Sequence, residues 1–385
     1  MRHFGDQYSL VVEVHLRKSI SDMKMSNSNM PFIKPTVSLV ALSFLLAVAT
    51  IIPASSLHAA TPTTPRAFHI ETQWNVGGKG GWGFLCLDAS THRLYIPRTD
   101  HVMVVDTVSG KVSGEVDGMT SVRDITLDDA GKYGYVADVT DGTAGFVRVF
   151  DRSTLKLVTS IPTGLIPYAI VFDPATKSVF VFNSRGHSAT VIDSATNQVI
   201  ATIPLSGRPS SAVADGKGGV FVTLPALGEI THIDTAARKV TASWQLAPCT
   251  GPNGLAIDTA RRQLFTACED HKLVAVDADT GHVTAIGDAP VNSGDIKFDS
   301  RHNMLFLADA SGTLTIFHRD SPIKYSRFQT IKTQPGARTM IVSEQDAKAY
   351  LVTSKFGQNT GAVSEELQFR PTPIPGTFSV IVVGR

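Results

Sequence analysis

Short apolar stretches alternate with polar turns along residues 77–385, and the pattern repeats about every 42 residues. Each stretch is rich in Val, Ile, Phe and Tyr, as in Val179–Phe182 and Tyr350–Val352, and Gly, Asp or Pro bounds it. Runs of this length and composition predict buried β-strands, not helices. Seven units of this period, each with four short strands, are typical of propeller blades. We therefore predict an all-β protein, a seven-bladed β-propeller with four-stranded antiparallel blades.

Aspartates end the first and third strands of most units. The first series is Asp88, Asp128, Asp173, Asp215, Asp258 and Asp299, with Ser343 in the seventh place. The second series is Asp106, Asp151, Asp193, Asp234 and Asp277, with His318 in the sixth place. An aspartate that precedes a turn accepts hydrogen bonds from the backbone of that turn. The regular recurrence favours this structural role over paired-carboxylate catalysis.

The repeat makes residues 61–385 one domain. The expected blades cover residues 77–116, 117–162, 163–204, 205–246, 247–286, 287–331 and 332–385. The last unit supplies three strands, and residues 67–76 match the outer strands of other units. We expect this N-terminal strand to complete the C-terminal blade, which would close the ring and protect its edges.

An apolar stretch without charges, Val37–Ile52, precedes the repeats. Lys24 and Lys34 lie before it and small residues follow it, which is typical of a secretory signal peptide. A membrane-spanning helix would need about 20 apolar residues. We predict a signal peptide over residues 25–60, with an uncleaved anchor as the alternative, and a periplasmic or secreted protein without stable membrane insertion. Residues 1–24 are interpreted as an extension from a start codon assigned too early.

Composition and charge narrow the class of partner. The chain is 43% hydrophobic and 18% charged, which excludes a disordered protein. Its 35 basic and 34 acidic residues fall to 30 and 31 when residues 1–60, which hold five and three of them, are removed. A nearly neutral domain has no general attraction to nucleic acid or anionic membrane, although a local basic patch is compatible with it. We expect a monomer.

Export would permit disulfides. Cys249 lies in the loop entering the fifth blade, and Cys268 ends the second strand of that blade. Both positions lie on the same face of a propeller, so we predict a disulfide between them, with two free thiols as the alternative. Cys86 lies between Leu85 and Leu87 and is expected to be a small buried core residue.

Several segments resemble known propellers. The second strand and its sequel in Val179–Asp193 resemble the Tyr-Val-Thr-Asn (YVTN) repeat. Gly77–Trp82, Cys249–Asp258 and Pro375–Arg385 are similar to the secreted YncE-like propeller proteins of bacteria. This resemblance covers the whole repeat region and implies a propeller fold and an exported location. Such propellers mostly have no assigned reaction, and related ones are described as binding ligands, proteins or DNA.

The chain departs from that family at two positions. Relatives often carry an acidic residue after the position of Trp82 and a histidine near the position of Arg123. Gly83 and Arg123 stand here instead, so no role of those family residues is carried over to this chain.

The loop that enters each innermost strand should line the mouth of the central channel. Five residues before the first-series positions lie Gly83, Arg123, Tyr168, Ser210, Asn253, Gly294 and Arg338. Four residues before them lie Phe84, Asp124, Ala169, Ser211, Gly254, Asp295 and Thr339. The second strands end on the same face with Asp138, Asn183, Cys268 and Asp309, and the long segment Ser354–Pro375, a binding loop or an ordinary surface loop, falls there too.

The candidate ligand-binding residues from this face are Trp82, Arg123, Asp124, Tyr168, Asn183, Asn253, Asp295 and Arg338. Arg123 and Arg338 are suited to hold an anionic group through forked hydrogen bonds. Tyr168 and Trp82 are suited to stack on a ring. The alternative is that Arg123, Asp124 and Asp295 form ion pairs that only close the channel.

No residue pattern identifies catalysis. Gly78–Gly83 matches G-x-G-x-x-G, but no predicted helix follows to present its N-terminus to a phosphate. The histidines of the domain are scattered without ligand spacing. We predict no cofactor, but a calcium site from Asp124, Asp295 and Asp309 is compatible with the sequence, because oxygen ligands leave little trace in it. The catalytic residues stay unknown.

Three functions remain after these exclusions. The leading hypothesis is an exported binding module that presents the channel mouth to a small molecule or a protein. The second is a metal-dependent lactonase or other hydrolase on the same scaffold, which rests on fold analogy alone. The third is single-stranded DNA binding by family analogy, which the neutral charge opposes.

Overall fold

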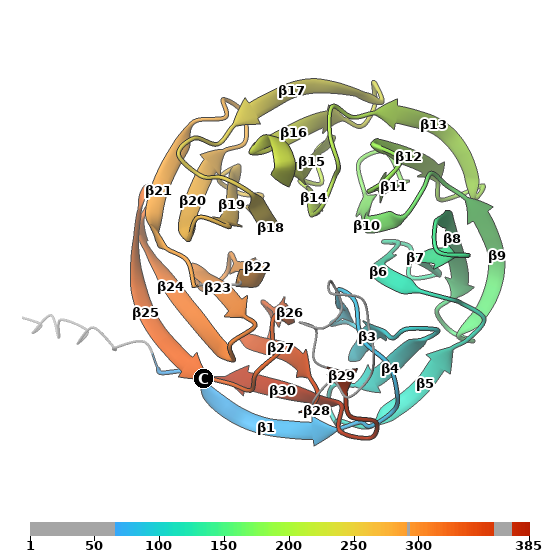
Figure 1. The fold of residues 1–385 in the computed structure, drawn as a ribbon, viewed down its shortest axis with the longest axis horizontal. Coiled ribbons are helices and arrows are strands. Elements are labelled where there is room, and N and C mark those ends of the chain that lie inside the picture. The colour runs from blue at the N-terminus through green and yellow to red at the C-terminus, as the bar shows by residue number, and fades with distance from the viewer. Residues whose placement is uncertain (1–65, 291–292, 358–371) are drawn as a thin grey trace, which may run out of the picture. The chain divides into compact units, whose positions relative to one another are not determined.

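A computed structural model describes residues 66–290, 293–357 and 372–385. Within these ranges the chain forms seven four-stranded antiparallel sheets arranged around a common centre (Figure 1). The described helical structure is one short turn, η1 (Pro225–Leu227). The predicted seven-bladed propeller class is therefore confirmed. The interpretations of residues 1–24 and 25–60 lie outside the described ranges.

Each blade is one sheet whose strands follow one another along the chain. Blade 1 contains β2 (Cys86–Asp88), β3 (Arg93–Pro97), β4 (Val102–Asp106) and β5 (Val112–Val116). Blade 2 contains β6 (Val122–Leu127), β7 (Tyr133–Thr140), β8 (Ala144–Asp151) and β9 (Lys156–Pro162). Blade 3 contains β10 (Pro167–Asp173), β11 (Ser178–Asn183), β12 (Ser188–Asp193) and β13 (Gln198–Pro204). Blade 4 contains β14 (Ala212–Ala214), β15 (Gly219–Leu224), β16 (Glu229–Asp234) and β17 (Lys239–Gln245).

Blades 5 and 6 follow the same order. Blade 5 contains β18 (Pro252–Asp258), β19 (Gln263–Cys268), β20 (Lys272–Asp277) and β21 (Val283–Asp288). Blade 6 contains β22 (Ser293–Asp299), β23 (Met304–Asp309), β24 (Thr313–Ser321) and β25 (Lys324–Lys332).

Blade 7 combines strands from the two ends of the domain. It contains β26 (Thr339–Ser343), β27 (Lys348–Thr353), β30 (Ser379–Gly384) and, outermost, β1 (His69–Asn75). β1 pairs antiparallel with β30, with Trp74 opposite Val380. The short strands β28 (Phe356–Gly357) and β29 (Thr372–Pro373) form a separate pair. The N-terminal strand expected over residues 67–76 is thus the outer strand of the C-terminal blade.

The hydrophobic core consists of seven clusters, one between each pair of neighbouring blades. A middle strand is covered on both faces, so β11 and β15 are buried along their whole length. The outer strands β9 and β13 are mostly exposed. Leu94 of blade 1 and Val382 of blade 7 belong to one cluster, so the same packing joins the last blade to the first.

The strand-end aspartates hold their turns, as predicted. Asp173 Oδ2 accepts hydrogen bonds from the Thr176 backbone N–H at 3.1 Å and from its hydroxyl at 2.7 Å. Asp193 Oδ1 accepts a bond from the Thr196 N–H at 2.8 Å. These contacts occupy the carboxylates, which supports scaffold over catalysis.

Some of these aspartates also join blades, which the sequence pattern did not predict. Arg152 of blade 2 forms ion pairs with Asp88 of blade 1 and with Asp128 of its own blade. Arg319 of blade 6 pairs in the same way with Asp258 of blade 5. Burial raises the pKa of Asp88, but hydrogen bonds from Ser90, Thr91 and Arg152 outweigh it and lower this pKa to about 2. The carboxylate therefore stays ionised in the fold.

Candidate functional site

The ends of the second strands anchor the loops that form the mouth of the channel. Asp138 Oδ1 accepts hydrogen bonds from the N–H groups of Thr120 and Ser121, at 3.0 and 2.8 Å. Thr353 Oγ1 donates to Pro335 O at 2.7 Å. Cys268 forms a disulfide with Cys249. One repeat position therefore fixes the entry loop of its own blade in several blades, each time with different chemistry.

Asn183 occupies this anchoring position in blade 3. It has no exposed surface, and its amide donates hydrogen bonds to Ser188 Oγ at 3.1 Å and Thr190 Oγ1 at 3.0 Å. Any β-carbon at Gly164, in the entry loop of this blade, would overlap the Asn183 side chain. The structure thus places Asn183 beneath the mouth loop and not on a ligand-accessible surface, contrary to its selection as a ligand contact.

Neighbouring entry loops bond to each other around the mouth. The Phe84 N–H donates to Arg123 O at 3.0 Å, and the Asp295 N–H donates to Arg338 O at 2.8 Å. A β-carbon at Gly83 or Gly294 would overlap these two carbonyl oxygens, so glycine is required at both places. Glycine at position 83 thus has a steric reason in this chain.

The two arginine side chains at the mouth carry unpaired charges. Arg123 and Arg338 are both exposed. Neither guanidinium forms an ion pair or a hydrogen bond with another residue of the described ranges. They lie at equivalent positions of blades 2 and 7, the two neighbours of blade 1. The structure thus leaves two forked donors free on the loops that flank blade 1.

The carboxylates beside them bond to the backbone of the next blade. Asp124 Oδ2 accepts a hydrogen bond from the Ile170 N–H, and Asp295 Oδ2 accepts one from the Met340 N–H, both at 2.9 Å. The alternative in which Arg123 and Asp124 form an ion pair that closes the channel is therefore wrong. Asp295 faces a different cation, Lys297 Nζ, at 3.8 Å.

The ring that contacts Tyr168 at the mouth is that of Phe84. The rings of Phe84 and Tyr168 meet edge to face, with centroids 5.7 Å apart. Burial raises the pKa of Tyr168, while the positive charges of Arg338 and Arg123 act in the opposite direction. Trp82 packs against Phe378 at 5.3 Å. Of the two aromatic residues predicted to stack on a ligand, Tyr168 is therefore the one that lies near both arginines.

A second group of side chains lies on the channel side of the inner strands. Burial raises the pKa of Asp124 to about 7, with Lys297 opposing this rise and Asp295 adding to it. Burial likewise raises the pKa of Cys86 to about 12, with the charge of Asp124 adding to it. Cys86 is a half-buried free cysteine, so its thiol stays protonated at neutral pH and is a poor nucleophile.

Lys297 is a residue that the sequence analysis missed. Two residues before the strand-end positions the chain has Cys86, Thr126, Val171, Val213, Ala256, Lys297 and Ile341. Lysine is the one charged residue in this series, and side chains two apart on a strand share a face. This departure from the repeat could have identified Lys297 from the sequence. The side chain lies on the channel side, beside Asp295.

The remaining candidates do not join this group. Asn253 is exposed on β18 of blade 5. Asp309 is fully buried and accepts a hydrogen bond from the Ser311 N–H at 2.8 Å within its own hairpin, where Thr313 also donates to it. The three carboxylates Asp124, Asp295 and Asp309 are thus each engaged by backbone or hairpin donors, and they do not form a compact ligand group in the described part of the chain.

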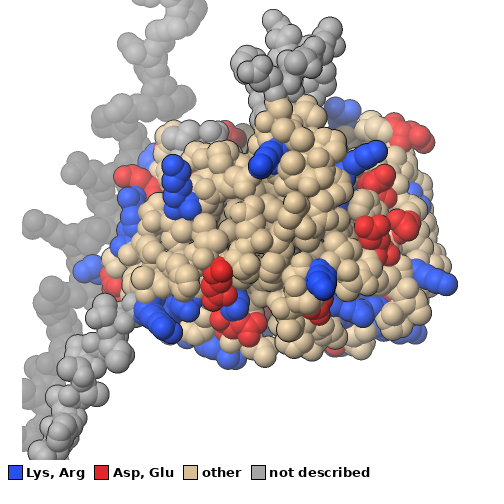
Figure 2. All heavy atoms as spheres, turned by 90° about the horizontal axis from the view of Figure 1, so that it is seen from below, with Lys and Arg blue, Asp and Glu red and all other residues tan. Residues whose placement is uncertain are grey.

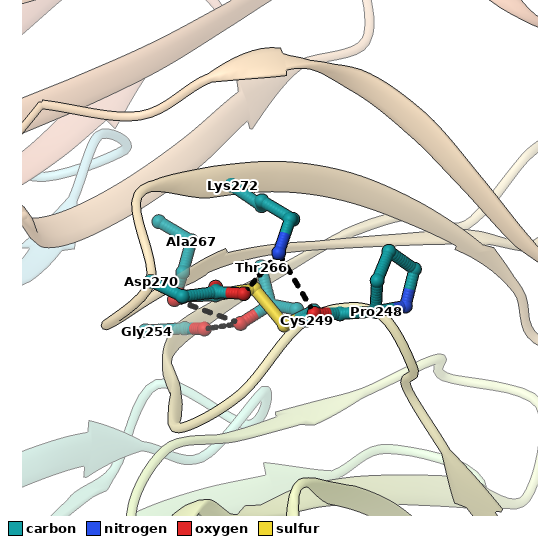
Figure 3. Close-up of a disulfide and its surroundings, with 8 residues drawn as sticks. Pro248, Cys249, Gly254, Thr266, Ala267, Asp270 and Lys272 are labelled. Atoms are coloured by element: carbon teal, nitrogen blue, oxygen red, sulfur yellow. Dashed lines mark hydrogen bonds and ion pairs between the residues drawn. A yellow bond between two sulfur atoms is a disulfide. The ribbon is translucent and has the colours of Figure 1, made fainter.

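The predicted cysteine pair is joined in the structure. The Cα atoms of Cys249 and Cys268 are 5.7 Å apart, within the usual range for a disulfide (Figure 3). The bond ties the loop that enters β18 to the end of β19. It therefore fixes the mouth of blade 5.

Acidic and basic side chains are interspersed over the side of the domain shown in Figure 2. This mixed surface agrees with the nearly neutral charge of the domain and offers no single-sign patch on that side. In the part of the chain that the structure describes, no helix is long and apolar enough to cross a membrane.

Comparison with known proteins shows partial sequence relatives. No protein-family model matches the chain. It is 29% identical over 143 residues to the "Uncharacterized protein YncE" of Salmonella typhimurium and 30% identical over 141 residues to the "Seven-bladed beta-propeller protein Rv1057" of Mycobacterium tuberculosis. These matches cover 34% and 36% of this chain and span 39% and 35% of the relatives' own lengths.

Solved structures share the fold at low identity. The Kuenenia stuttgartiensis hydrazine synthase structure has a TM-score of 0.62 and 15% identity, over 73% of this chain and 94% of that one. The structure of U3-55K has a TM-score of 0.66 and 8% identity, over 82% of this chain and 98% of that one. The fold makes this chain a seven-bladed β-propeller, and part of its sequence is similar to YncE and to Rv1057.

Proposed function

We propose that this propeller is an exported, monomeric binding module whose channel mouth binds a small molecule or protein segment with an anionic group. The observation that carries the proposal is the pair of exposed guanidinium groups, Arg123 and Arg338, without partners among the described residues. A guanidinium matches the two oxygens of a carboxylate or phosphate through parallel hydrogen bonds. Two such groups on loops held by backbone hydrogen bonds form a preorganised anion site.

The neighbouring rings narrow the ligand class. Phe84 and Tyr168 lie edge to face beside the arginines, and both are half-buried. A planar ligand gains contact with such a pair through edge or offset stacking. We therefore favour an anion attached to a flat ring, such as an aromatic carboxylate or an aryl phosphate.

The inner side chains support binding over catalysis. Cys86 is held as a thiol, and Asp124 and Asp295 are engaged by backbone N–H groups of the next blade. A nucleophile with an adjacent general base, which acyl transfer would need, is not formed by these groups. A calcium-dependent hydrolase would have to recruit the same carboxylates from these contacts.

The arginine pair can be tested with probes that differ only in charge. Benzoate and phenyl phosphate should bind the purified domain, and neutral benzamide should not, as measured by isothermal titration calorimetry. The double variant Arg123→Ala, Arg338→Ala should weaken binding by at least about 100-fold, because each of the two lost charge-assisted hydrogen bonds contributes about 1.5–3 kcal/mol.

Arg301→Ala is the matched control, because Arg301 is an exposed arginine in the turn that follows β22, at the opposite end of the inner strands. It should bind both anions like the wild type. Equal affinity of the double variant and the wild type would contradict the proposal. A single-stranded oligonucleotide belongs in the same experiment: binding that is lost steeply with salt and in the double variant would favour a nucleic-acid ligand instead.

Export is supported by the apolar segment in residues 25–60 and by the Cys249–Cys268 disulfide, which persists in oxidising compartments. We expect the protein recovered from the cell envelope or medium to begin close to residue 61. N-terminal mass spectrometry checks this expectation. A mature protein that retains His3 would contradict both the cleavage and the reassigned start.

A further inference from the structure

The surroundings of the disulfide contain a third metal-ligating group. Cys249, Cys268 and Asp270 bring their Sγ and carboxylate oxygen atoms within 4.8 Å of one another. The two cysteines are 2% and 3% exposed, and Asp270 is half-buried. The hairpin after β19 holds this arrangement, since the Glu269 N–H donates to Thr250 O at 3.0 Å and the His271 N–H donates to Cys268 O at 3.0 Å.

Lys272 holds one oxygen of the Asp270 carboxylate, and the other oxygen is available as a ligand atom. Lys272 forms an ion pair with Asp270 Oδ2 and also donates to Pro248 O at 3.0 Å, next to Cys249 (Figure 3). Asp270 Oδ1 is buried and accepts no hydrogen bond of normal geometry from the described residues, although the backbone N–H groups of Thr250 and Asp270 help to stabilise the carboxylate. Buried carboxylate oxygens usually have a donor, so an unused one beside two sulfurs is an available ligand atom.

We propose that reduction of the Cys249–Cys268 disulfide creates a site for a thiophilic metal ion, Zn²⁺ or Cu⁺, with Cys249, Cys268 and Asp270 as ligands. Two thiolates and a carboxylate suit Zn²⁺, and thiolates also select Cu⁺. Three protein ligands leave a fourth position for water or an external ligand. Lys272, which holds the second carboxylate oxygen, acts as a positioning residue.

The redox step requires a two-electron reductant, for which a dithiol is the biological class. The S–S bond breaks, two electrons pass from the two thiols of the reductant, and their protons end on Cys249 and Cys268 while the reductant becomes a disulfide. Metal binding then displaces both protons, because the ligands are thiolates. The sulfurs must separate to about 3.8 Å to share one tetrahedral zinc, so disulfide and metal exclude each other.

Cobalt(II) is a suitable probe, since thiolate ligands give it a charge-transfer band and tetrahedral coordination gives it intense visible absorption. The full-length mature protein is reduced with a phosphine, freed of reductant without oxygen, and titrated with Co²⁺ and then Zn²⁺. We expect one equivalent of cobalt to bind the reduced protein and zinc to displace it. The oxidised protein should give no such spectrum.

Variants separate this site from adventitious binding. Cys86→Ser removes the remaining cysteine and should keep the cobalt spectrum. Asp270→Asn and Lys272→Ala leave the disulfide in place for folding, and each should weaken cobalt binding by about 10-fold or more. Cys249→Ser should abolish the charge-transfer band.

Three outcomes would overturn the proposal. They are a reduced Cys86→Ser variant without cobalt absorption, an Asp270→Asn variant that binds as tightly as wild type, and a reduced protein that loses its β-sheet circular dichroism and does not regain it with cobalt. The site is independent of the proposed anion site, because Arg123→Ala, Arg338→Ala should not change the cobalt titration.

Discussion

Replacing Arg98 with methionine should lower the free energy of unfolding by about 4 kcal/mol, because it removes a buried guanidinium that holds a whole loop. Arg98 is 1% exposed and lies 3.7 Å above the Phe378 ring. Its nitrogens donate hydrogen bonds of 2.8 to 3.2 Å to the carbonyl oxygens of Gly77, Lys79, Gly80 and Gly81. Burial lowers its pKa to about 10, so it remains charged at neutral pH.

The position of this loop makes the effect global. Residues 77–81 connect β1 of blade 7 to blade 1, and the Gly376 N–H donates to Gly78 O at 2.9 Å. Loss of the guanidinium leaves four carbonyl groups without their donor at the junction of the last and first blades. An unsatisfied buried acceptor costs about 1–3 kcal/mol, and water can replace the donor at Lys79 and Gly80, which are exposed.

Urea denaturation followed by intrinsic fluorescence measures the change. Arg98→Lys keeps the charge but not the fork, so it should lose less stability than the methionine variant. Arg301→Met, at an exposed arginine, should change stability by less than about 0.5 kcal/mol. An Arg98→Met protein within about 1 kcal/mol of the wild type would show that the loop is held by other contacts.

The Gly-rich loop illustrates what a sequence pattern can and cannot predict. Gly78–Gly83 matches a phosphate-binding motif, and the missing helix was enough to reject that interpretation. Four carbonyls of residues 77–81 instead turn towards Arg98. The repeat identified the end of the second strand as a shared position. It could not show that Arg98 holds the entry loop of blade 1, as Asp138 and Cys268 hold the entry loops of their blades.

The residues of the candidate site could be predicted where they differ from the residues at the same position in other repeat units. Arg123, Arg338 and Tyr168 stand out because the residues at their repeat position otherwise include glycine and serine. Phe84 was placed at the mouth but not chosen as a candidate, and Lys297 was missed, although strand alternation places it on the same face as Asp295. The partner of Asp124, the Ile170 N–H, belongs to the next blade, and such a contact depends on how blades register with one another, which one sequence does not reveal.

Asp124 should make the stability of the propeller fall as the pH rises. Burial, aided by Asp295, raises its pKa from 3.8 to about 7, against the hydrogen bonds from Ile170 and Ile125 and the charge of Lys297. The folded state therefore binds this proton more tightly than the unfolded state. The contribution is fully present below about pH 4 and is lost as the pH passes through 7, in total at most about 4 kcal/mol.

Asp124→Asn isolates this contribution from all other titrating groups. The asparagine resembles the protonated acid but does not titrate. As the pH rises, the wild type should therefore lose stability relative to the variant. We expect a change of about 3 kcal/mol between pH 5 and pH 8. Urea denaturation at several pH values measures it, and a pH-independent difference would contradict the raised pKa.

Asp88→Asn is the contrasting variant, because the pKa of Asp88 is shifted in the opposite direction from that of Asp124. The pKa of Asp88 is lowered to about 2, so its contribution is present above about pH 4 and is lost only as the pH falls through 2. This variant should therefore be less stable than the wild type by a constant amount from pH 5 to pH 8, since Arg152 loses one of its two carboxylate partners throughout. The free energy of unfolding relative to wild type should change with pH for Asp124→Asn and stay constant for Asp88→Asn. This result would assign the pH dependence of stability to the channel carboxylate and not to the inter-blade ion pairs.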